Sequence, residues 1–508
     1  MRKFALLIAV LGVLLTGALL STLAADVSVT MVLSRDPISM DPQGPIDPSA
    51  PVILAYVYDT LLFQDNEGAI LPYLATSWDV EQDGRLITFH LRDDVQFSNG
   101  DPLNADSVIF TFQRLQEIGQ RSFIYSEIIN IAEFEKVDDY TVRFHLRAPS
   151  VTLLSALTYT YAGILDPSAV EAAGDEYGQN PVGSGPYMVT EWIPQNSMTL
   201  VANPNYHGQR PTDQDGQASA VTELDIRFSS DESARVNALL TGEVDVAYIS
   251  SGALMQSFAD NPDFTILDSP TRGLVFLGFN TAREPFSDVT MRQAVAEAID
   301  KQVILDIAAP GMGVIVNELI APSIFGYVPE LESEALPYDV DTARAAVEAA
   351  GYVGAEIKIL TSNFPTYQNM ATIVQAELQE IGLNPTIEVL DFAGVAATAN
   401  AGEYDIVLTR YDWNDPDLLR IYLSTDSIGR ANRYFYSNPE LDALTAEGRA
   451  TFDPAERLAI YTEAQRLLMQ DVPWVPLHMT ITKIVVNNRL QNVGVVNSHV
   501  TFDDATTQ

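Results

Sequence analysis

Hydrophobic and polar positions repeat with two different periods, that of a strand and that of a helix. Segments with the two periods alternate along the chain. Segments that alternate every second residue, such as 86–91 (LITFHL), predict strands with one buried face. Segments with apolar residues three or four positions apart, such as 104–117, predict helices, and from residue 274 onward strands and helices alternate as in a mostly parallel sheet. The pattern predicts an α/β protein. Its expected strands are 26–33, 86–91, 141–146, 274–279, 356–360, 387–390, 404–409 and 483–487, and its expected helices are 52–62, 104–117, 233–240, 287–307, 341–350, 367–381 and 454–470.

The first 25 residues have the order of a secretory signal peptide. Arg2 and Lys3 place positive charge at the end, residues 4–20 are almost all apolar, and small residues follow up to Ala25. We expect cleavage after Ala24 or Ala25. An uncleaved membrane anchor is the alternative, although the apolar stretch is barely long enough to span a bilayer.

The composition indicates the compartment of the protein and excludes some kinds of partner. The chain has 28 Lys and Arg against 68 Asp and Glu, a net charge of −40, and 47% hydrophobic residues. Such a globular but acidic protein repels phosphate backbones and anionic lipids, so we expect no nucleic-acid partner. The absence of cysteine excludes disulfides, thiolate metal sites and lipidation on cysteine. We therefore expect a periplasmic or extracellular protein, secreted with a cleaved signal peptide and not lipidated.

Catalytic and metal motifs are weak. Ser184 lies between two glycines in PVGSGPY, but its spacing is not that of a nucleophile elbow, and a tight turn is the simpler interpretation. The five histidines are scattered, and segment 213–216 (DQDG) lacks the third ligand of a calcium loop. We expect no catalytic residue, no metal and no cofactor. A secreted hydrolase is the rival class, and it would need a placed nucleophile or metal set.

The most promising chemistry follows the expected strand 404–409. In parallel α/β sheets, ligands bind beyond the carboxyl ends of strands, and here the chain continues Arg410-Tyr411-Asp412-Trp413-Asn414-Asp415-Pro416-Asp417. A carboxylate in this segment can pair with an ammonium group, Arg410 can grip a carboxylate, and Trp413 offers a flat apolar wall. The alternative is a Pro-Asp turn that caps a helix near residue 418.

Seven stretches in a fixed order resemble the peptide-, dipeptide- and nickel-binding solute-binding proteins of ABC importers, bacterial extracellular solute-binding protein family 5. The stretches are LPYLATSWDVEQDGRLITFHLRDDVQFSNGDPLNADSVIFTF (71–112), PVGSGPY (181–187), NALLTGEVDVAYI (237–249), FLGFNTAREPFSDVTMRQAVAEAIDKQVIL (276–305), YDVDTARAAVEAAGY (338–352), WNDPDLL (413–419) and VPWVPL (472–477).

This resemblance implies a two-lobed periplasmic-binding-protein fold with a hinge and an extra inserted domain. Lobe I would comprise 26–59, 181–275 and 478–508; inserted domain II would be 60–180, and lobe III 276–477. Segments near 274–280 and 474–482 would cross between the lobes. Hinge closure would capture a small ligand, and the closed form would dock as a monomer on the membrane permease subunits of an ABC importer.

The resemblance also implies site residues. In peptide-binding relatives an acid just after the matching Trp binds the ligand's amino terminus; Asp415 is the nearest match here, and Asp417 competes with it because the segment is shorter. The other expected ligand-binding residues are Tyr411 beside them, Asp36 and Met40 in the loop 35–42 (RDPISMDP), and Asn363 and Tyr367 in the segment 362–367 (SNFPTY). Dipeptide-binding relatives carry an Arg near 362–367, which this chain lacks. An oligopeptide is the expected ligand, with an oligosaccharide, an opine-like amino acid or chelated nickel as alternatives.

Overall fold

The computed structural model describes residues 27–45, 47, 49–208, 210–211 and 219–507. The expected signal peptide and the segment 213–216 lie outside them. Among the described residues, no helix has both the length and the apolar character needed to cross a membrane.

Lobe I is built on β1 (Val27–Leu33), the first expected strand. Its alternating side chains bury Val29 and Met31 completely, and β1 pairs in parallel with β10 (Val221–Phe228) and β11 (Val246–Ile249). Two antiparallel strands, β9 (Ser197–Ala202) and β8 (Tyr187–Ile193), extend the sheet on the β10 side. Smaller elements of this lobe are α1 (Ala50–Val57), α6 (Glu232–Leu240), α7 (Gly252–Met255), β18 (Leu490–Gln491), β19 (Gly494–Val496), β20 (His499–Thr501) and β21 (Thr506–Thr507).

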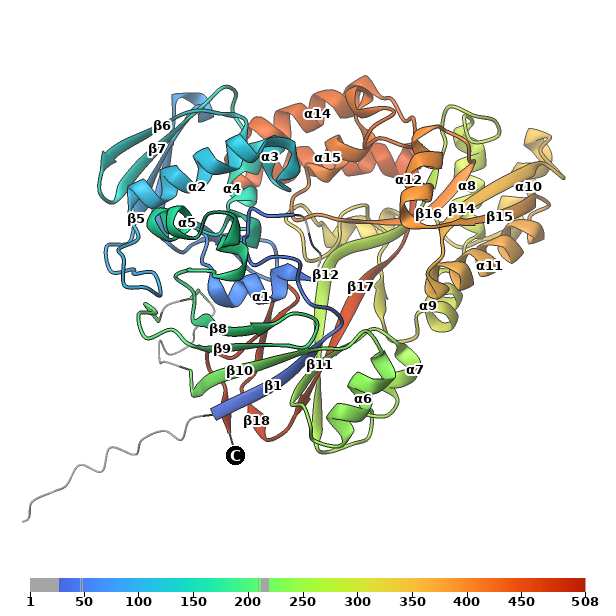
Figure 1. Cartoon of the computed structure of the whole chain (residues 1–508). Coiled ribbons are helices and arrows are strands. Elements are labelled where there is room, and N and C mark those ends of the chain that lie inside the picture. Colours follow the sequence, from blue (N-terminus) through green and yellow to red (C-terminus); the bar gives the residue numbers. More distant parts are fainter. Residues whose placement is uncertain (1–26, 46, 48, 209, 212–218, 508) are drawn as a thin grey trace, which may run out of the picture.

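Two long strands run from lobe I into the other half of the molecule (Figure 1). They are β12 (Phe264–Phe279) and β17 (Trp474–Asn487), which pair antiparallel over nearly their whole length. Their register shifts between Pro270 and Leu274, where the strands pass from one lobe to the other. They are the crossing segments expected from the sequence, and β12 starts ten residues earlier than the expected strand 274–279.

Lobe III continues the same sheet with β16 (Ile406–Asp412), β14 (Glu356–Ser362) and β15 (Asn384–Leu390). One hydrophobic cluster joins one face of this sheet to α8, α9, α10 and α11, and another joins the opposite face to α12, α13, α14 and α15. The helix bounds are α8 Val289–Ala298, α9 Lys301–Ala308, α10 Val340–Ala350, α11 Pro365–Glu380, α12 Phe392–Asn400, α13 Leu418–Leu423, α14 Pro439–Ala450 and α15 Pro454–Asp471, and β13 (Gly313–Ile315) pairs with β17.

The single helix expected at 287–307 is wrong, because the structure has two helices there. Ile299 leaves the helical conformation, with φ −89° and ψ 114°. Asp300 then caps α9 by accepting hydrogen bonds from the backbone N–H groups of Gln302 and Val303. Apolar periodicity continues across the break, so the pattern hides the N-cap signal of Asp300.

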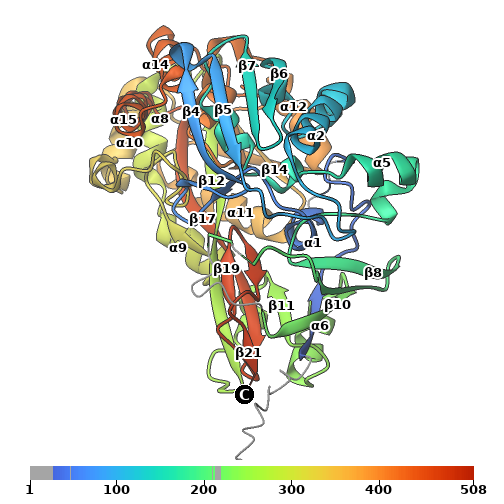
Figure 2. The same ribbon diagram turned by 90° about the vertical axis from the view of Figure 1, so that its left-hand side faces the viewer.

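Domain II stands beside lobe III (Figures 1 and 2). Its antiparallel sheet has the order β4 (Ala75–Glu81), β5 (Leu86–Leu91), β7 (Thr141–Leu146) and β6 (Ile131–Asp138), and α2 (Ala105–Ile118) packs on it around Phe112. The remaining elements are β2 (Leu62–Gln64), β3 (Ile70–Pro72), α3 (Tyr125–Ile128), α4 (Thr152–Ala156) and α5 (Pro167–Ala173). Its hydrophobic cluster spans 61–164, whereas Leu165 and Tyr177 pack in the lobe I cluster.

The PVGSGPY segment forms a buried turn. Ser184 is fully buried, and its hydroxyl donates a 2.9 Å hydrogen bond to Asp59, which His207 also contacts at 3.3 Å. Gly183 packs so closely on the main chain that a Cβ atom there would lie 1.9 Å from the Val57 carbonyl oxygen. The serine therefore has a structural role beside a carboxylate.

Candidate ligand-binding cleft

The carboxyl ends of the parallel strands in lobe III meet at one edge of the sheet. Strand β14 is parallel to both β15 and β16, so Ser362, Leu390 and Asp412 end on the same side. Polar residues follow these strands, and Asn363 is exposed there with its backbone N–H bonded to the Leu390 carbonyl at 2.8 Å. Such an edge is where α/β proteins bind small molecules.

Arg410 and Asp412 lie together on one face of β16. Tyr411, between them, points to the opposite face, and both charged side chains are exposed. Within the described chain, neither side chain has a hydrogen bond or an ion pair. Burial raises the pKa of the Tyr367 phenol, which Arg410 lowers and Asp412 raises in addition. Tyr367, in the first turn of α11, therefore lies within electrostatic reach of both unpaired charges.

Trp413 turns from this edge toward domain II. Its ring lies 5.7 Å from that of Phe123 and 6.5 Å from that of Tyr159, and the indole is only partly buried. Beside these rings lies a cavity of about 10 Å³, room for about one water molecule. The indole thus joins a group of aromatic rings from domain II and lobe III.

Arg272 lies in β12, at the shift in the β12–β17 register. Its carbonyl accepts a 3.4 Å hydrogen bond from the backbone N–H of Trp413, and its guanidinium donates to the side-chain oxygen of Asn497 in lobe I. Burial lowers the pKa of Arg272, and the charges of Tyr159 and Asp412 oppose this shift. Groups from the hinge, domain II and both lobes thus converge at this point.

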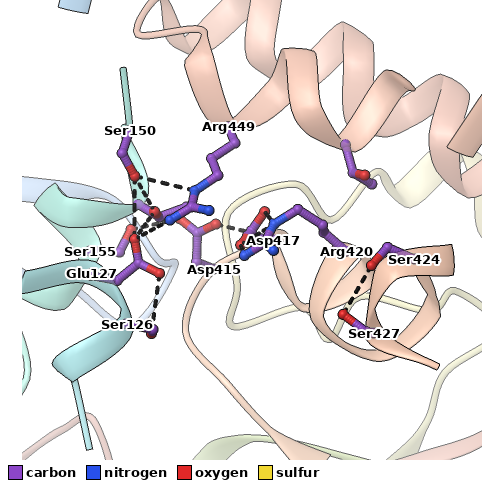
Figure 3. A network of polar contacts seen from close by, with 12 residues as sticks. Ser126, Glu127, Ser150, Ser155, Asp415, Asp417, Arg420, Ser424, Ser427 and Arg449 are labelled. Atoms are coloured by element: carbon purple, nitrogen blue, oxygen red, sulfur yellow. Dashed lines mark hydrogen bonds and ion pairs between the residues drawn. The ribbon is translucent and has the colours of Figure 1, made fainter. Parts of the chain in front are cut away.

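The two acids expected to bind an amine already have partners (Figure 3). Asp415 is 2% exposed and accepts from Arg457 and Ser155, both at 2.6 Å; burial disfavours its ionised form, but Arg457 outweighs this effect and lowers the carboxyl's pKa. Asp417 is 1% exposed, accepts from Arg420 at 2.6 Å, and has its pKa raised by burial to about 6. Both acids are thus buried and paired inside the protein.

Three other expected site residues also have internal partners. Asp36 accepts hydrogen bonds from the Trp192 indole (2.9 Å) and from a backbone N–H group, and Met40 is fully buried in the lobe I core. The Tyr411 hydroxyl binds two backbone groups of the loop 319–321, at 2.7 and 3.1 Å. Each of these side chains was expected to face the ligand, and each is instead used for packing or internal hydrogen bonds.

An ion pair also joins domain II to lobe III. Arg449 of α14 donates to Glu127 of α3 at 2.9 Å, and the Val151 backbone N–H donates to the Arg449 carbonyl at 2.9 Å. Ser150 adds a hydrogen bond to Glu127 at 3.3 Å (Figure 3). With the Ser155–Asp415 hydrogen bond, these contacts form a polar seam between the two halves.

The sequence-based set thus omitted Asp412, Arg272 and Tyr159. A signal for Asp412 was present: if the expected strand 404–409 is extended to 412, its alternation places Arg410 and Asp412 on one exposed face. Nothing in the sequence pairs Arg272 with Tyr159 or Asn497, because only the fold brings these three positions together.

Two α/β lobes joined by paired crossing strands, with unpaired charges and aromatic rings at the sheet edge between them, define a two-lobed solute-binding protein. The model of bacterial extracellular solute-binding proteins, family 5, matches residues 69–430, more than half of the chain. The chain belongs to this family, which confirms the resemblance seen in the sequence.

Known relatives and structures match along most of the chain. The di/tripeptide-binding protein 2 of Pseudomonas aeruginosa is 28% identical over 453 residues, which cover 82% of each chain. The periplasmic binding protein DppA of Helicobacter pylori in complex with the peptide STSA is 26% identical, with a TM-score of 0.74 over 94% of this chain and 97% of that one. HbpA2 of Haemophilus parasuis has a TM-score of 0.85 at 24% identity, over 95% and 100% of the two chains, and supports the fold alone.

Proposed function

We propose that this protein is the extracytoplasmic solute-binding component of an ABC importer and captures a peptide-like ligand between lobes I and III. The proposal rests above all on the unpaired charges of Arg410 and Asp412 beside the Trp413 wall. A zwitterionic guest with variable side chains needs such charges and such a sequence-tolerant wall. The family and its peptide-binding relatives agree with this assignment.

In this proposal Asp412 takes the place first given to Asp415. A ligand ammonium would pair with Asp412, and Asn363 and Tyr367 would border the same end of the site. Arg410 remains available for a polar or anionic group of the ligand. Closure brings both lobes onto the ligand, so the ligand stabilises the closed form because only that form makes both sets of contacts.

Export and delivery complete the proposal. Residues 1–25 would be removed as a signal peptide, and a chain without cysteine would remain free, without a lipid anchor. The closed monomer would then present its surface to the permease. We infer no covalent chemistry, because Ser184 is buried against Asp59 and the family consists of solute-binding proteins.

A thermal-shift screen tests the proposed ligand class. We expect di- to tetrapeptides with free termini to raise the melting temperature, since a ligand that binds only the native state adds about 2.7 kcal/mol of stability at one hundred times its Kd. Oligosaccharides and nickel chelates are the comparison ligands. Stabilisation by one of these and by no peptide, or hydrolysis of a peptide by the purified protein, would contradict the proposal.

The polar seam should stabilise the closed form of the protein, because its contacts join domain II to lobe III. We expect Arg449→Gln, and separately Glu127→Gln, to weaken peptide binding about three- to tenfold, because each removes a partly buried contact between the halves. Isothermal titration of both single variants and the double variant measures the coupling. Independent, additive effects would show that this ion pair does not contribute to closure.

A further inference from the structure

Glu318 is a buried acid in the loop 316–328 of lobe III, which we call the Glu318 loop. Its side chain is 0% exposed, and one carboxylate oxygen accepts a 3.0 Å hydrogen bond from the backbone N–H of Val328. Among the described residues, the other oxygen has no hydrogen-bond partner, and no basic side chain lies within ion-pair distance of the acid. An ionised carboxylate is far more costly in such a place than a neutral acid, so Glu318 holds a proton at neutral pH.

The titratable groups that face Glu318 are acidic. Burial raises the pKa of Glu318 to about 8, and the charges of Glu332 and Glu330 add to this effect. The phenols of Tyr327 and Tyr411 also stand close to it, since Glu318 raises the pKa of both. Loss of the proton would therefore add a negative charge next to groups that already disfavour one.

The Glu318 loop supports the segment that follows β16. The Tyr411 hydroxyl binds two backbone groups of this loop. At its tip, a Cβ atom on Gly326 would lie 3.1 Å from the Pro416 side chain. The hydrogen bond from Val328 to Glu318 joins the two ends of the loop. The neutral acid thus holds the conformation on which Tyr411 and Pro416 pack.

The same loop meets domain II. The turn between β2 and β3 packs on it so closely that a Cβ atom at Gly68 would lie 2.4 Å from the Phe325 backbone nitrogen. Gln64 of β2 donates to the carbonyl groups of Gly68 at 3.0 Å and Asn414 at 3.1 Å. Main-chain contacts of this kind depend on the exact shape of the loop. The Glu318 loop therefore determines how closely domain II and lobe III can approach.

We propose that Glu318 is a positioning residue for ligand capture, and that its proton links the affinity for the ligand to pH. The neutral acid keeps the loop in the shape that meets domain II. The ionised acid needs water, and the loop has to move to admit it, while the proton passes to the solvent. The closed form is then weakened, so affinity falls as the pH rises through about 8. The inference rests on the proposed function for the ligand, but not for the response of the loop.

Glu318→Gln tests this link, because the amide keeps the side-chain shape and an acceptor for the Val328 N–H group but cannot ionise. Met-Leu and Ser-Thr-Ser-Ala are titrated into the wild type and the variant at about pH 6.5 and about pH 9. We expect the two proteins to bind each peptide within about twofold of one another at the lower pH, and the variant to bind at least about fivefold more tightly at the higher pH. The ratio of the two affinities at each pH cancels the titration of the peptide's own amino group.

Glu377→Gln is the matched control. Glu377 of α11 also accepts one backbone N–H group, from Asp300, and also has one buried oxygen without a partner in the described structure. Burial raises its pKa to about 8 as well. Because Glu377 lies in α11 and not in the Glu318 loop, its variant should keep the wild-type dependence of affinity on pH.

Lys301 is the other group near this loop that titrates in the same range. Burial lowers the pKa of its amine to about 8, and the amine donates a 2.6 Å hydrogen bond to the Asn317 side chain. A pH dependence caused by this lysine would persist in Glu318→Gln. Equal changes of affinity with pH in the wild type and Glu318→Gln therefore overturn the inference.

Peptide-free measurements separate this inference from the proposed function. The folded state holds a proton that the unfolded chain releases above about pH 4.5, so the stability that it contributes is lost between about pH 4.5 and about pH 8. We expect the melting temperature of Glu318→Gln to match that of the wild type near pH 5 and to exceed it by at least about 2 °C near pH 8. A difference that is the same at both pH values overturns the assignment of the proton.

Hydrogen exchange of the ligand-free protein then reports on the loop itself. After correction for the intrinsic rate, amides of residues 319–328 should exchange at least about threefold faster near pH 9 than near pH 7 in the wild type, and equally fast in Glu318→Gln. If neither peptide binds the wild type, the peptide assignment fails, while this difference still supports the response of the loop. Exchange that does not change with pH in the wild type overturns the inference.

Discussion

Replacing Arg457 with methionine is expected to lower the free energy of unfolding by about 3–5 kcal/mol, because removing one partner of a buried ion pair leaves the other charge without compensation. Asp415 would lose its 2.6 Å contact and retain only Ser155 and one backbone N–H group, at 2% exposure. The Arg457 guanidinium also stacks over Phe325 and Tyr461, at 5.3 and 5.2 Å from their ring centres, so its replacement loses packing as well.

Urea unfolding of the wild type and the variant measures this loss. Adding Asp415→Asn to Arg457→Met should recover part of the stability, since the uncompensated charge is then absent. Arg344→Met is the matched control, because the side chain of Arg344 is 37% exposed, and it should change stability by less than about 1 kcal/mol. A loss of less than about 1 kcal/mol in the free energy of unfolding of Arg457→Met would show that the Arg457–Asp415 pair does not stabilise the fold.

The elements could be predicted from the sequence where local patterns decide the structure. The alternation in β1, β5 and β7 corresponds to strands with buried faces, and the helical periods of 104–117 and 454–470 correspond to α2 and α15. The prediction was wrong at 287–307, where the N-cap of α9 interrupts an apolar period that continues across it. Ordered stretches of sequence, and not composition, led to the correct family.

The candidate site could be located but its members could not be chosen. The sequence predicts ligand binding by the segment 410–417. In the structure some of its residues are exposed, and others are paired inside the protein. Asp412 is exposed, while Asp415 is paired with Arg457, 42 residues away, and Ser155, 260 residues away. Such long-range partners decide whether a carboxylate is available to a ligand, and no local pattern encodes them. For the same reason Arg272, whose partner Asn497 is 225 residues away, gave no signal.

Neighbouring acids can therefore have different roles: one stabilises the loop after β16, and another is available to bind the ligand. A paired acid such as Asp415 fixes the loop after β16 against α15 and domain II, and the loop then holds Trp413 beside Tyr159. A rigid support shell of this kind lowers the ordering cost of binding. The unpaired Asp412 can then keep its charge for the ligand.

Asp412→Asn should therefore weaken binding of a peptide with a free amino terminus by about 2–4 kcal/mol, because the ligand ammonium would be enclosed on closure without a counter-charge. Isothermal titration of the free peptide and its N-acetyl derivative tests this contact. The acetylated peptide should bind the wild type and Asp412→Asn with similar affinity, since it brings no ammonium group.

Asp341→Asn, on the exposed side of α10, is the control for a change in net charge and should leave the affinity unchanged. Unchanged affinity of Asp412→Asn for the free peptide would remove this acid from the site. A loss that is the same for the free and acetylated peptides would instead mean that Asp412 acts on the shape of the cleft. Selective loss of the amine preference in Asp412→Asn would place the amino terminus of the peptide at this end of β16.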